Sequence, residues 1–199
     1  MSAPVALIDA GGANLGSVRY ALERLGATPR IVRDADGLRG AARVILPGVG
    51  AAAPAMRLLR DGGFADVLPA LDVPLLGICL GMQLLFQRSE EGDVDGLGLL
   101  PGVVRRMVPA PGLRVPHMGW NRLRLRRASP LMAGIDDGAR AYFVHGYAVE
   151  PGADCVAEAE HGAVLAAVVE RGRVAGAQFH PERSGATGAR LLRNFLEAA

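Results

Sequence analysis

Residues 74–83 read Pro-Leu-Leu-Gly-Ile-Cys-Leu-Gly-Met-Gln, an apolar run that passes directly into a cysteine flanked by glycines. The run has the length and composition of a buried strand, and residues 80–87 have the pattern of a helix. Gly77 and Gly81 lie two positions before and after Cys79, which is the spacing of a nucleophile elbow with cysteine in place of serine. Glycines suit such a strained turn because flanking side chains would collide. We therefore predict a strand–turn–helix unit with the thiol at its turn.

The thiol of Cys79 has two interpretations. As a nucleophile it would lie at a helix N-terminus, where the dipole favours the thiolate, and the backbone N–H of Leu80 would be free to hold an oxyanion. As a structural residue it would be a buried thiol at the end of a strand. The paired glycines favour the nucleophile. Cys155, the second cysteine, lies in a strand-like run and is expected in the core.

The same alternation of short apolar runs and helical patterns extends through the first half of the chain. Strands are expected at 5–9, 29–32, 44–46 and 74–78, and helices at 15–25, around 56–59 and at 80–87. Asn14 is expected to cap the first helix and Gly26 to end it. Short strands dominate after Gly92, at 103–108, 121–126, 140–144, 155–160, 165–170 and 174–178, before a closing helix at 187–197.

This order predicts an α/β fold. Alternating strands and helices imply right-handed crossovers and a parallel sheet that is covered on both faces. We expect a single domain over residues 1–199, with an open, mixed, mostly parallel sheet, helices on both faces and a flavodoxin-like core. The later strands are expected as antiparallel additions to that domain.

Composition excludes several classes of function. Of the 199 residues, 50% are hydrophobic and 21% are charged, which indicates a folded chain. The net charge of +2 gives no electrostatic case for nucleic acid as the main partner. All 22 basic residues are arginine, so a lysine Schiff base and the lysine of a phosphate-binding loop are both excluded.

Targeting and metal-binding signals are not evident either. Two cysteines make no disulfide framework, and the start MSAPVALIDA lacks the basic and long apolar regions of a signal peptide. No apolar stretch approaches the roughly 20 residues of a membrane span. No pair of residues has metal-ligand spacing, so neither a metal nor a cofactor is expected. We expect a protein of the reducing cytoplasm without membrane contacts.

A base for the thiol is found in the run Gln178-Phe-His-Pro-Glu182. His180 follows an expected strand, and Pro181 favours an extended conformation at the residue before it. Glu182 is two positions on, so its carboxylate can bind one ring nitrogen while the other faces the thiol. Alone, His-Pro-Glu fits a surface turn. Together with the elbow it makes a candidate Cys79–His180–Glu182 triad.

A second oxyanion donor is expected in the loop Pro47-Gly48-Val49-Gly50, which follows the strand at 44–46. A glycine-rich loop after a strand can aim bare N–H groups at a site. Acyl transfer benefits from such a donor besides Leu80. An ordinary turn is the alternative.

Other segments carry weaker signals. The loop at 10–17 lies where a nucleotide would bind, but Ala13 breaks the dinucleotide pattern and Ser17 breaks the phosphate-loop pattern. It is interpreted as a tight strand-to-helix turn, and a ligand contact stays open. Alternating arginines at 122–126 predict a strand with one solvated face, with a phosphate or partner patch as the alternative. His117 and His161 are expected in solvent, and His145 at the end of a strand.

Taken together, these motifs resemble those of the class I, or triad, glutamine amidotransferases. The stretches GICLGMQLLF (77–86), PGVG (47–50) and HPE (180–182) occur in that family's order. Within the family the chain is most similar to the glutaminase subunits of imidazole glycerol phosphate synthases. That similarity lies in the pattern at 8–18, in PHMGWN (116–121) and in HPERSG (180–185), and it covers essentially the whole chain.

The resemblance implies a role for each matching residue. Cys79 would attack the carboxamide of glutamine, His180 would move the proton and Glu182 would orient His180. N–H groups of Leu80 and of the loop at 48–50 would hold the oxyanion. The implied oxyanion loop is Gly48, Val49 and Gly50, the implied substrate grip is Gln83, Glu91 and Tyr147, and the implied partner-facing positions are Asn14, Met118, Trp120, Asn121 and Arg183.

The resemblance also implies a heterodimer with a (β/α)8-barrel cyclase. That subunit would receive the ammonia and make imidazole glycerol phosphate and aminoimidazole carboxamide ribonucleotide in histidine biosynthesis. Trp120, the only tryptophan, suits an interface anchor, although a core position is equally open without the resemblance. Ala10, Ala13, Gly146 and Arg183 depart from the family's pattern, so the contacts at those positions are expected to differ from the family's.

Three alternatives compete with this function. The first is the glutaminase of another synthase, such as anthranilate or aminodeoxychorismate synthase, against which PHMGWN argues. The second is a non-catalytic partner that regulates a synthase, against which the intact triad argues. The third is a stand-alone cysteine hydrolase built on the same elbow.

Overall fold

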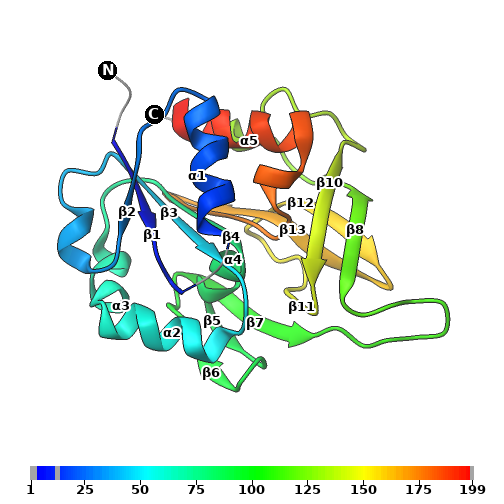
Figure 1. Ribbon diagram of the computed structural model, residues 1–199. Helices are drawn as coiled ribbons and strands as arrows, with labels where there is room; N and C mark the ends of the chain where they lie inside the picture. The colour runs from blue at the N-terminus through cyan, green and yellow to red at the C-terminus, as the bar shows by residue number, and fades with distance from the viewer. Residues whose placement is uncertain (1–3, 12–13, 198–199) are drawn as a thin grey trace.

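The computed structural model describes residues 4–11 and 14–197. Its centre is an eight-stranded sheet in the order β2-β1-β3-β4-β14-β13-β12-β9 (Figure 1). Five neighbouring strands are parallel, and β13, β12 and β9 extend the sheet in antiparallel pairing. The strands span β1 Val5–Ile8, β2 Pro29–Val32, β3 Arg43–Gly48, β4 Leu75–Cys79, β14 Val174–Ala177, β13 Ala163–Arg171, β12 Cys155–His161 and β9 Arg124–Leu125.

Helices cover both faces of this sheet. Figure 1 shows α1 and α5 on one face and α2 and α3 on the other. These helices span α1 Leu15–Arg24, α2 Ala52–Asp61, α3 Phe64–Val67 and α5 Gly185–Glu197. The predicted α/β fold, with a mostly parallel mixed sheet between helices, is confirmed.

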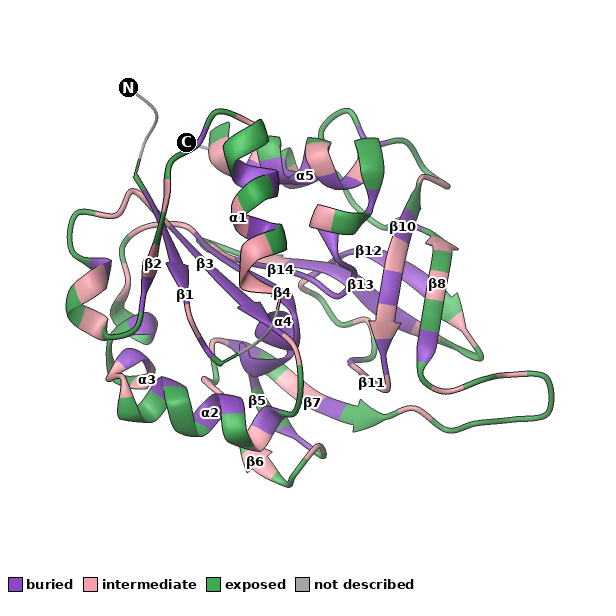
Figure 2. Cartoon of the chain, in the orientation of Figure 1, coloured by how far each residue is buried: buried purple, intermediate pink, exposed green. Residues whose placement is uncertain are grey.

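The period of the strands divides the core into two layers. In β1, Val5 and Leu7 pack in one hydrophobic cluster, and Ala6 and Ile8 pack in the other, because successive side chains point to opposite faces. Figure 2 shows the central strands buried along their length, while the outer surfaces of α1 and α2 are exposed. The first cluster takes Val18, Leu22, Leu191 and Phe195 from α1 and α5, and the second takes Met56, Leu59 and Phe64 from α2 and α3.

Two small sheets complete the described chain. Strands β8 (His117–Arg122) and β10 (Arg140–His145) form an antiparallel pair. Strands β5 (Phe86–Ser89), β6 (Val94–Asp95), β7 (Leu100–Arg106) and β11 (Tyr147–Ala148) form a four-stranded sheet in the order β11-β7-β5-β6. The expected antiparallel additions therefore lie only partly in the main sheet.

The helix predicted at 80–87 is shorter than expected. Helix α4 (Leu80–Leu84) ends early, and the apolar chain continues from Phe86 as a strand. The carbonyls there accept hydrogen bonds from another segment instead of from the next helical turn. Leu97 N–H donates to the Leu84 carbonyl, and Gly98 N–H donates to the Phe86 carbonyl. Periodicity cannot separate a buried helix end from a buried strand, and the neighbouring strands decide the outcome.

The strand predicted at 121–126 is divided. Arg122 ends β8, which pairs with β10, whereas Arg124 and Leu125 form β9 beside β12. Its arginines are exposed as expected, but two of them are paired: Arg124 and Arg126 both bind the carboxylate of Glu158, a buried residue of β12. The segment is therefore an ion-paired edge of the main sheet.

The caps of α1 follow the prediction at one end only. Gly26 adopts a left-handed conformation with φ of 82° just beyond the helix, as expected of a terminating glycine. Asn14 stands at the N-cap position, but its side chain makes no capping hydrogen bond. Its amide is directed toward His180 and Glu182 instead.

Candidate active site

Cys79 lies at a strained turn between β4 and α4. Its φ is 54° and its ψ is −112°, a backbone conformation that residues other than glycine rarely adopt. The neighbouring glycines are required by close packing: a Cβ on Gly81 would overlap the Leu46 carbonyl oxygen, and one on Gly77 would lie 2.6 Å from the Gly81 carbonyl oxygen. The elbow anticipated from the glycine spacing is therefore present in the backbone.

His180 approaches this thiol from the end of β14. Its backbone is extended, with φ of −97° and ψ of 97°, as Pro181 requires of the residue before it. Its Nδ1 lies 2.8 Å from Oε1 of Glu182, and both side chains are buried. The amide of Asn14 donates to the same carboxylate oxygen and lies 3.3 Å from His180 Nδ1.

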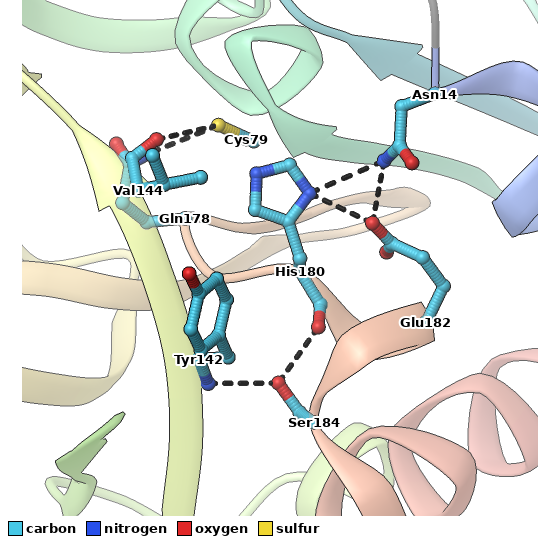
Figure 3. Close-up of polar contacts among 8 residues, drawn as sticks. All are labelled: Asn14, Cys79, Tyr142, Val144, Gln178, His180, Glu182 and Ser184. Carbon is cyan, nitrogen blue, oxygen red and sulfur yellow. Dashed lines mark hydrogen bonds and ion pairs between the residues drawn. The ribbon is translucent and has the colours of Figure 1, made fainter. Parts of the chain in front are cut away.

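The ring of His180 stands between Cys79 and Glu182 (Figure 3). Nε2 of His180 and Oε2 of Glu182 are buried without a hydrogen-bond partner among the described residues. Burial alone would lower the pKa of His180, but the closeness of Cys79 and the hydrogen bond and charge of Glu182 outweigh burial and raise the pKa to about 10. The imidazole is thus set to hold a proton beside the sulfur.

A cavity of about 330 Å³ opens in front of the thiol. Five segments contribute to its wall: the loop after β3, the elbow, the turn between β5 and β6, the junction of β10 with β11, and the end of β14. The predicted site residues that it brings together are Cys79, His180, Val49, Gly50, Leu80, Gln83, Glu91 and Tyr147. Gly48 stays in β3, where its Cα pairs with that of Cys79, and Glu182 lies behind His180.

Gln83 and Glu91 both line the cavity beside the elbow. Both amide hydrogens of Gln83 are engaged, since Nε2 donates to the Tyr147 carbonyl and to Oε1 of Gln178, each at 2.9 Å. Oε2 of Glu91 accepts from the backbone N–H of Ala52 at 2.9 Å, at the N-terminus of α2. Burial raises the pKa of Glu91, and this hydrogen bond opposes the rise. A partly buried carboxylate of this kind favours a cationic ligand.

Sequence reasoning missed three groups around the sulfur of Cys79. Gln178 is fully buried, and its Nε2 lies 3.8 Å from the sulfur of Cys79. The thiol in turn lies 3.8 Å from the carbonyl oxygen of Val144, and His145 lines the cavity beside it. The available signal was Gln178 itself, a polar residue at the buried end of a strand directly before the His180 motif.

Comparisons with known proteins agree with this arrangement. The class-I glutamine amidotransferase family model matches residues 6–199. The chain belongs to the class-I glutamine amidotransferases. It is 68% identical over 193 residues to the imidazole glycerol phosphate synthase subunit HisH of Xanthomonas euvesicatoria pv. vesicatoria, covering 97% of this chain and 96% of that protein. It is 67% identical, with the same coverage, to the HisH subunit of Xylella fastidiosa strain Temecula1.

Solved structures extend the comparison to the fold. A crystal structure of a glutamine amidotransferase matches with a TM-score of 0.76 at 25% identity, covering 97% of both chains. A structure of PurLQS from Thermotoga maritima matches with a TM-score of 0.75 at 22% identity, covering 98% of both chains. The second likeness concerns the fold alone.

The residues expected at a partner interface of this glutamine amidotransferase lie mainly on β8 and beside it. Met118 and Trp120 are exposed by 64% and 51%, so Trp120 is not a core residue. Trp120 meets the ring of Tyr142 edge-on, and the guanidinium of Arg183 lies 4.6 Å from the centre of that ring. Asn14 is set apart from this group and contacts the triad instead.

The expectation for His117 was wrong. Instead of standing in solvent it is buried at the start of β8, with its ring stacked between Phe143 and His161. His161 is half-buried at the end of β12, and His145 ends β10 as expected. Phe143 of β10 packs against the ring of His117, and the Pro116-His117 pair alone gives no sign of this contact.

The remaining expectations concern departures from the family's pattern and ligands. Gly146 lines the cavity, Ala10 is buried, and Ala13 lies outside the described residues. Over residues 4–11 and 14–197, no group of three or more His, Cys, Asp or Glu side chains is arranged so that it could hold a metal ion. Within the same residues no helix has the length and hydropathy needed to cross a bilayer.

Proposed function

We propose that this chain is the glutaminase subunit of an imidazole glycerol phosphate synthase. It would hydrolyse glutamine through Cys79, His180 and Glu182 and pass ammonia to a (β/α)8-barrel cyclase. The observation that carries the proposal is the buried His180 ring, which has Glu182 on one nitrogen and the Cys79 sulfur on the side of the other. The HisH relatives are subunits of that synthase, which favours it over other glutamine-dependent synthases.

The first half of the reaction forms a thioester. His180 Nε2 holds the proton that the Cys79 thiol has given up, and the resulting thiolate attacks the carboxamide carbon of glutamine. The resulting oxyanion would be held by the N–H of Leu80 and by an N–H of the loop at Gly48, Val49 or Gly50. Collapse of the tetrahedral intermediate breaks the carbon–nitrogen bond, and His180 returns its proton to the departing ammonia.

The second half releases glutamate. A water molecule attacks the thioester carbonyl and gives a proton to His180, and the Cys79 sulfur leaves. Glu182 keeps the imidazole oriented and stabilises its protonated form, which agrees with the direction of the His180 pKa shift. The buried sulfur and imidazole are then ready for another glutamine.

The polar groups around the cavity suit the amino-acid end of glutamine. Glu91 is a partly buried carboxylate with no cationic partner among the described residues, and the α-ammonium of the substrate would supply that charge. Because the Gln83 nitrogen is occupied by two protein acceptors, its Oε1 is the atom of that amide left to accept from the substrate.

The proposal is tested by measuring glutamate release with and without the candidate cyclase and its nucleotide substrate. We expect slow turnover alone and strong stimulation by the partner. Cys79→Ala is expected to abolish glutamine-dependent synthesis while leaving synthesis from ammonium salts intact, because the ammonia is used on the other subunit.

Three outcomes would contradict the proposal. Full glutaminase activity without a partner would favour a stand-alone cysteine hydrolase. Stimulation of the cyclase by Cys79→Ala with glutamine present would favour a regulatory partner. Activation by a chorismate-using synthase in place of the cyclase would move the chain to another synthase.

A further inference from the structure

The backbone carbonyl of Tyr147 joins two groups of buried polar side chains. It lies 2.9 Å from Nε2 of Gln83 and 2.8 Å from Nδ1 of His145. A carbonyl oxygen can only accept, so both partners must present an N–H to it. This one acceptor therefore fixes the orientation of the Gln83 amide and the position of a proton on His145.

The amide arm runs from this carbonyl to the sulfur. The second hydrogen of Gln83 Nε2 is donated to Oε1 of Gln178, at 2.9 Å. The nitrogen of Gln178 is thereby turned toward Cys79, and it lies 3.8 Å from the sulfur. An N–H directed at the sulfur stabilises the thiolate, which is the reactive form.

The imidazole arm runs from the same carbonyl to β8. Burial lowers the pKa of His145 to about 4, so its ring is neutral with Nδ1 protonated and Nε2 bare. That bare nitrogen lies 3.0 Å from Nδ1 of His117, which must then be the donor. Burial also lowers the pKa of His117 to about 3, so its Nε2 is an acceptor, and the amide nitrogen of Asn121 lies 3.2 Å from it.

Asn121 stands at the end of this arm, and its amide orientation is fixed by further hydrogen bonds. Its amide nitrogen also donates to the Glu160 carbonyl at 2.8 Å, and its oxygen accepts from the N–H of Arg122 at 2.8 Å. Each proton in the series thus has one possible place. The result is a continuous series of hydrogen bonds that links Asn121, His117, His145, the Tyr147 carbonyl, Gln83, Gln178 and Cys79, with His145 and Gln83 both donating to the carbonyl. We name it the Asn121–Cys79 chain.

We propose that His117 and His145 are positioning residues, which act through the Tyr147 carbonyl to hold Gln83 and Gln178 in place for glutamine binding and for the Cys79 thiolate. The proposal rests on the proposed glutaminase function and adds to it residues that touch neither the nucleophile nor its base. The arm begins on the strand that exposes Met118 and Trp120, so the pocket wall and that surface share one rigid hydrogen-bonded support.

A purely structural role for His117 is the competing explanation. Its ring packs between Phe143, with 4.7 Å between ring centres, and His161, with 4.2 Å. His117→Phe keeps a stacked ring and removes both ring nitrogens. His117→Asn removes the ring but keeps an N–H near the position of Nδ1. The two variants therefore separate packing from hydrogen bonding.

The experiment measures two quantities on each variant. One is the steady-state kinetics of glutamine hydrolysis in the complex with the cyclase, and the other is the rate at which iodoacetamide alkylates Cys79 in the chain alone. His117→Phe is expected to raise KM for glutamine about tenfold, the worth of one hydrogen bond, and to slow alkylation several-fold. His117→Asn is expected to stay within about twofold of the unaltered protein in both.

His161→Phe is the matched control. The ring of His161 stacks on His117 but takes no part in the Asn121–Cys79 chain. Its own polar contact is with the Arg114 carbonyl. The variant is expected to leave KM and the alkylation rate within about twofold of their original values. Equal losses in His117→Asn and His117→Phe, or a His117→Phe variant with unchanged KM and alkylation, would overturn the proposal.

Nitrogen-15 NMR of the unaltered protein provides a test that needs no variant. Both His117 and His145 are expected to be neutral at pH 7 with the proton on Nδ1. A proton on Nε2 of either ring would break the series and overturn the proposal. If the unaltered complex hydrolyses no glutamine, the proposed function fails instead, and the tautomers and the alkylation of Cys79 still decide this inference.

Discussion

Buried imidazoles in this protein differ in charge because they differ in neighbours. His180 lies beside a carboxylate and a thiol, and these raise its pKa to about 10 against the effect of burial. His145 is buried among other imidazoles, and its pKa falls to about 4. One ring is thus suited to carry a proton in a reaction, whereas the other is suited to a fixed tautomer. The same residue type serves two purposes through its surroundings.

This difference predicts an acid-sensitive stability. Between pH 6.5 and 5, His117 and His145 stay neutral in the folded protein, while in the unfolded chain they take up protons with a pKa near 6.5. The unfolded state then binds more protons, so stability falls as the pH falls. Each such histidine contributes a slope of up to about 1.4 kcal/mol per pH unit. Urea unfolding at a series of pH values measures this slope.

His117→Asn removes one of the two titrations and is expected to flatten the slope by about half. His180 does not interfere in this window, because its raised pKa contributes stability that is fully present below 6.5 and is lost only as the pH rises toward 10. A free energy of unfolding that is level from pH 6.5 to 5 would show that the two rings are protonated in the folded state.

At the scale of elements, the site depends on the contact of β3, β4 and α4. Gly48, Gly77 and Gly81 are the points of contact, and a Cβ on any of them would lie 2.6 Å or less from a backbone atom. This contact brings the loop after β3 beside the cysteine turn. It also lets the chain turn from strand to helix with the sulfur directed into the cavity.

Gly81→Ala is expected to lower the free energy of unfolding by about 3 kcal/mol or more. The new Cβ would overlap the Leu46 carbonyl, and the backbone of β3 or of α4 would have to shift to make room for it. Equilibrium unfolding in urea measures the loss. Gly152→Ala is the control, since nothing lies within 4 Å of a Cβ there. Equal stabilities of the two variants would mean that the elbow can relax and that Gly81 serves another purpose.

Local patterns predicted the elements that have local causes. The elbow follows from glycine spacing, and the extended His180 follows from Pro181, so both were accessible from the sequence. The end of α4 at Leu84 was not, because hydrogen bonds to a distant part of the chain decide it. The burial of His117 was also hidden, since it depends on Phe143 and His161, which are 26 and 44 positions away in the sequence.

At the scale of the molecule, the cavity gathers groups from segments that are far apart in the sequence. They come from the carboxyl ends of β3, β4 and β14, from the turn between β5 and β6, and from the junction of β10 with β11. Parallel strands end at one edge of the sheet, which is where open α/β sheets place their sites. The candidate triad was accessible because its members stand in two recognisable motifs, the cysteine elbow and His180-Pro-Glu182. The Asn121–Cys79 chain was not, because its members share no motif.

Strand β8 presents an exposed surface of apolar and aromatic side chains. Met118 and Trp120 are both exposed on β8, with Tyr142 against the indole and Arg183 against the ring of Tyr142. A half-exposed tryptophan on a rigid strand is the kind of residue that dominates binding energy at an interface. Trp120→Ala is therefore expected to weaken binding of the cyclase by about 2 kcal/mol or more, roughly thirtyfold in Kd.

Titration of the cyclase by isothermal calorimetry measures this affinity. Val67→Ala is the matched control, because Val67 is also an exposed apolar residue but lies on α3, at the opposite end of the sheet in Figure 1. Its Kd is expected to match that of the unaltered protein. Both variants need the same unfolding midpoint as the original chain, so that a change in Kd reports the surface. An unchanged Kd in Trp120→Ala would place the interface away from β8, and the partner-facing role expected of Trp120 would be wrong.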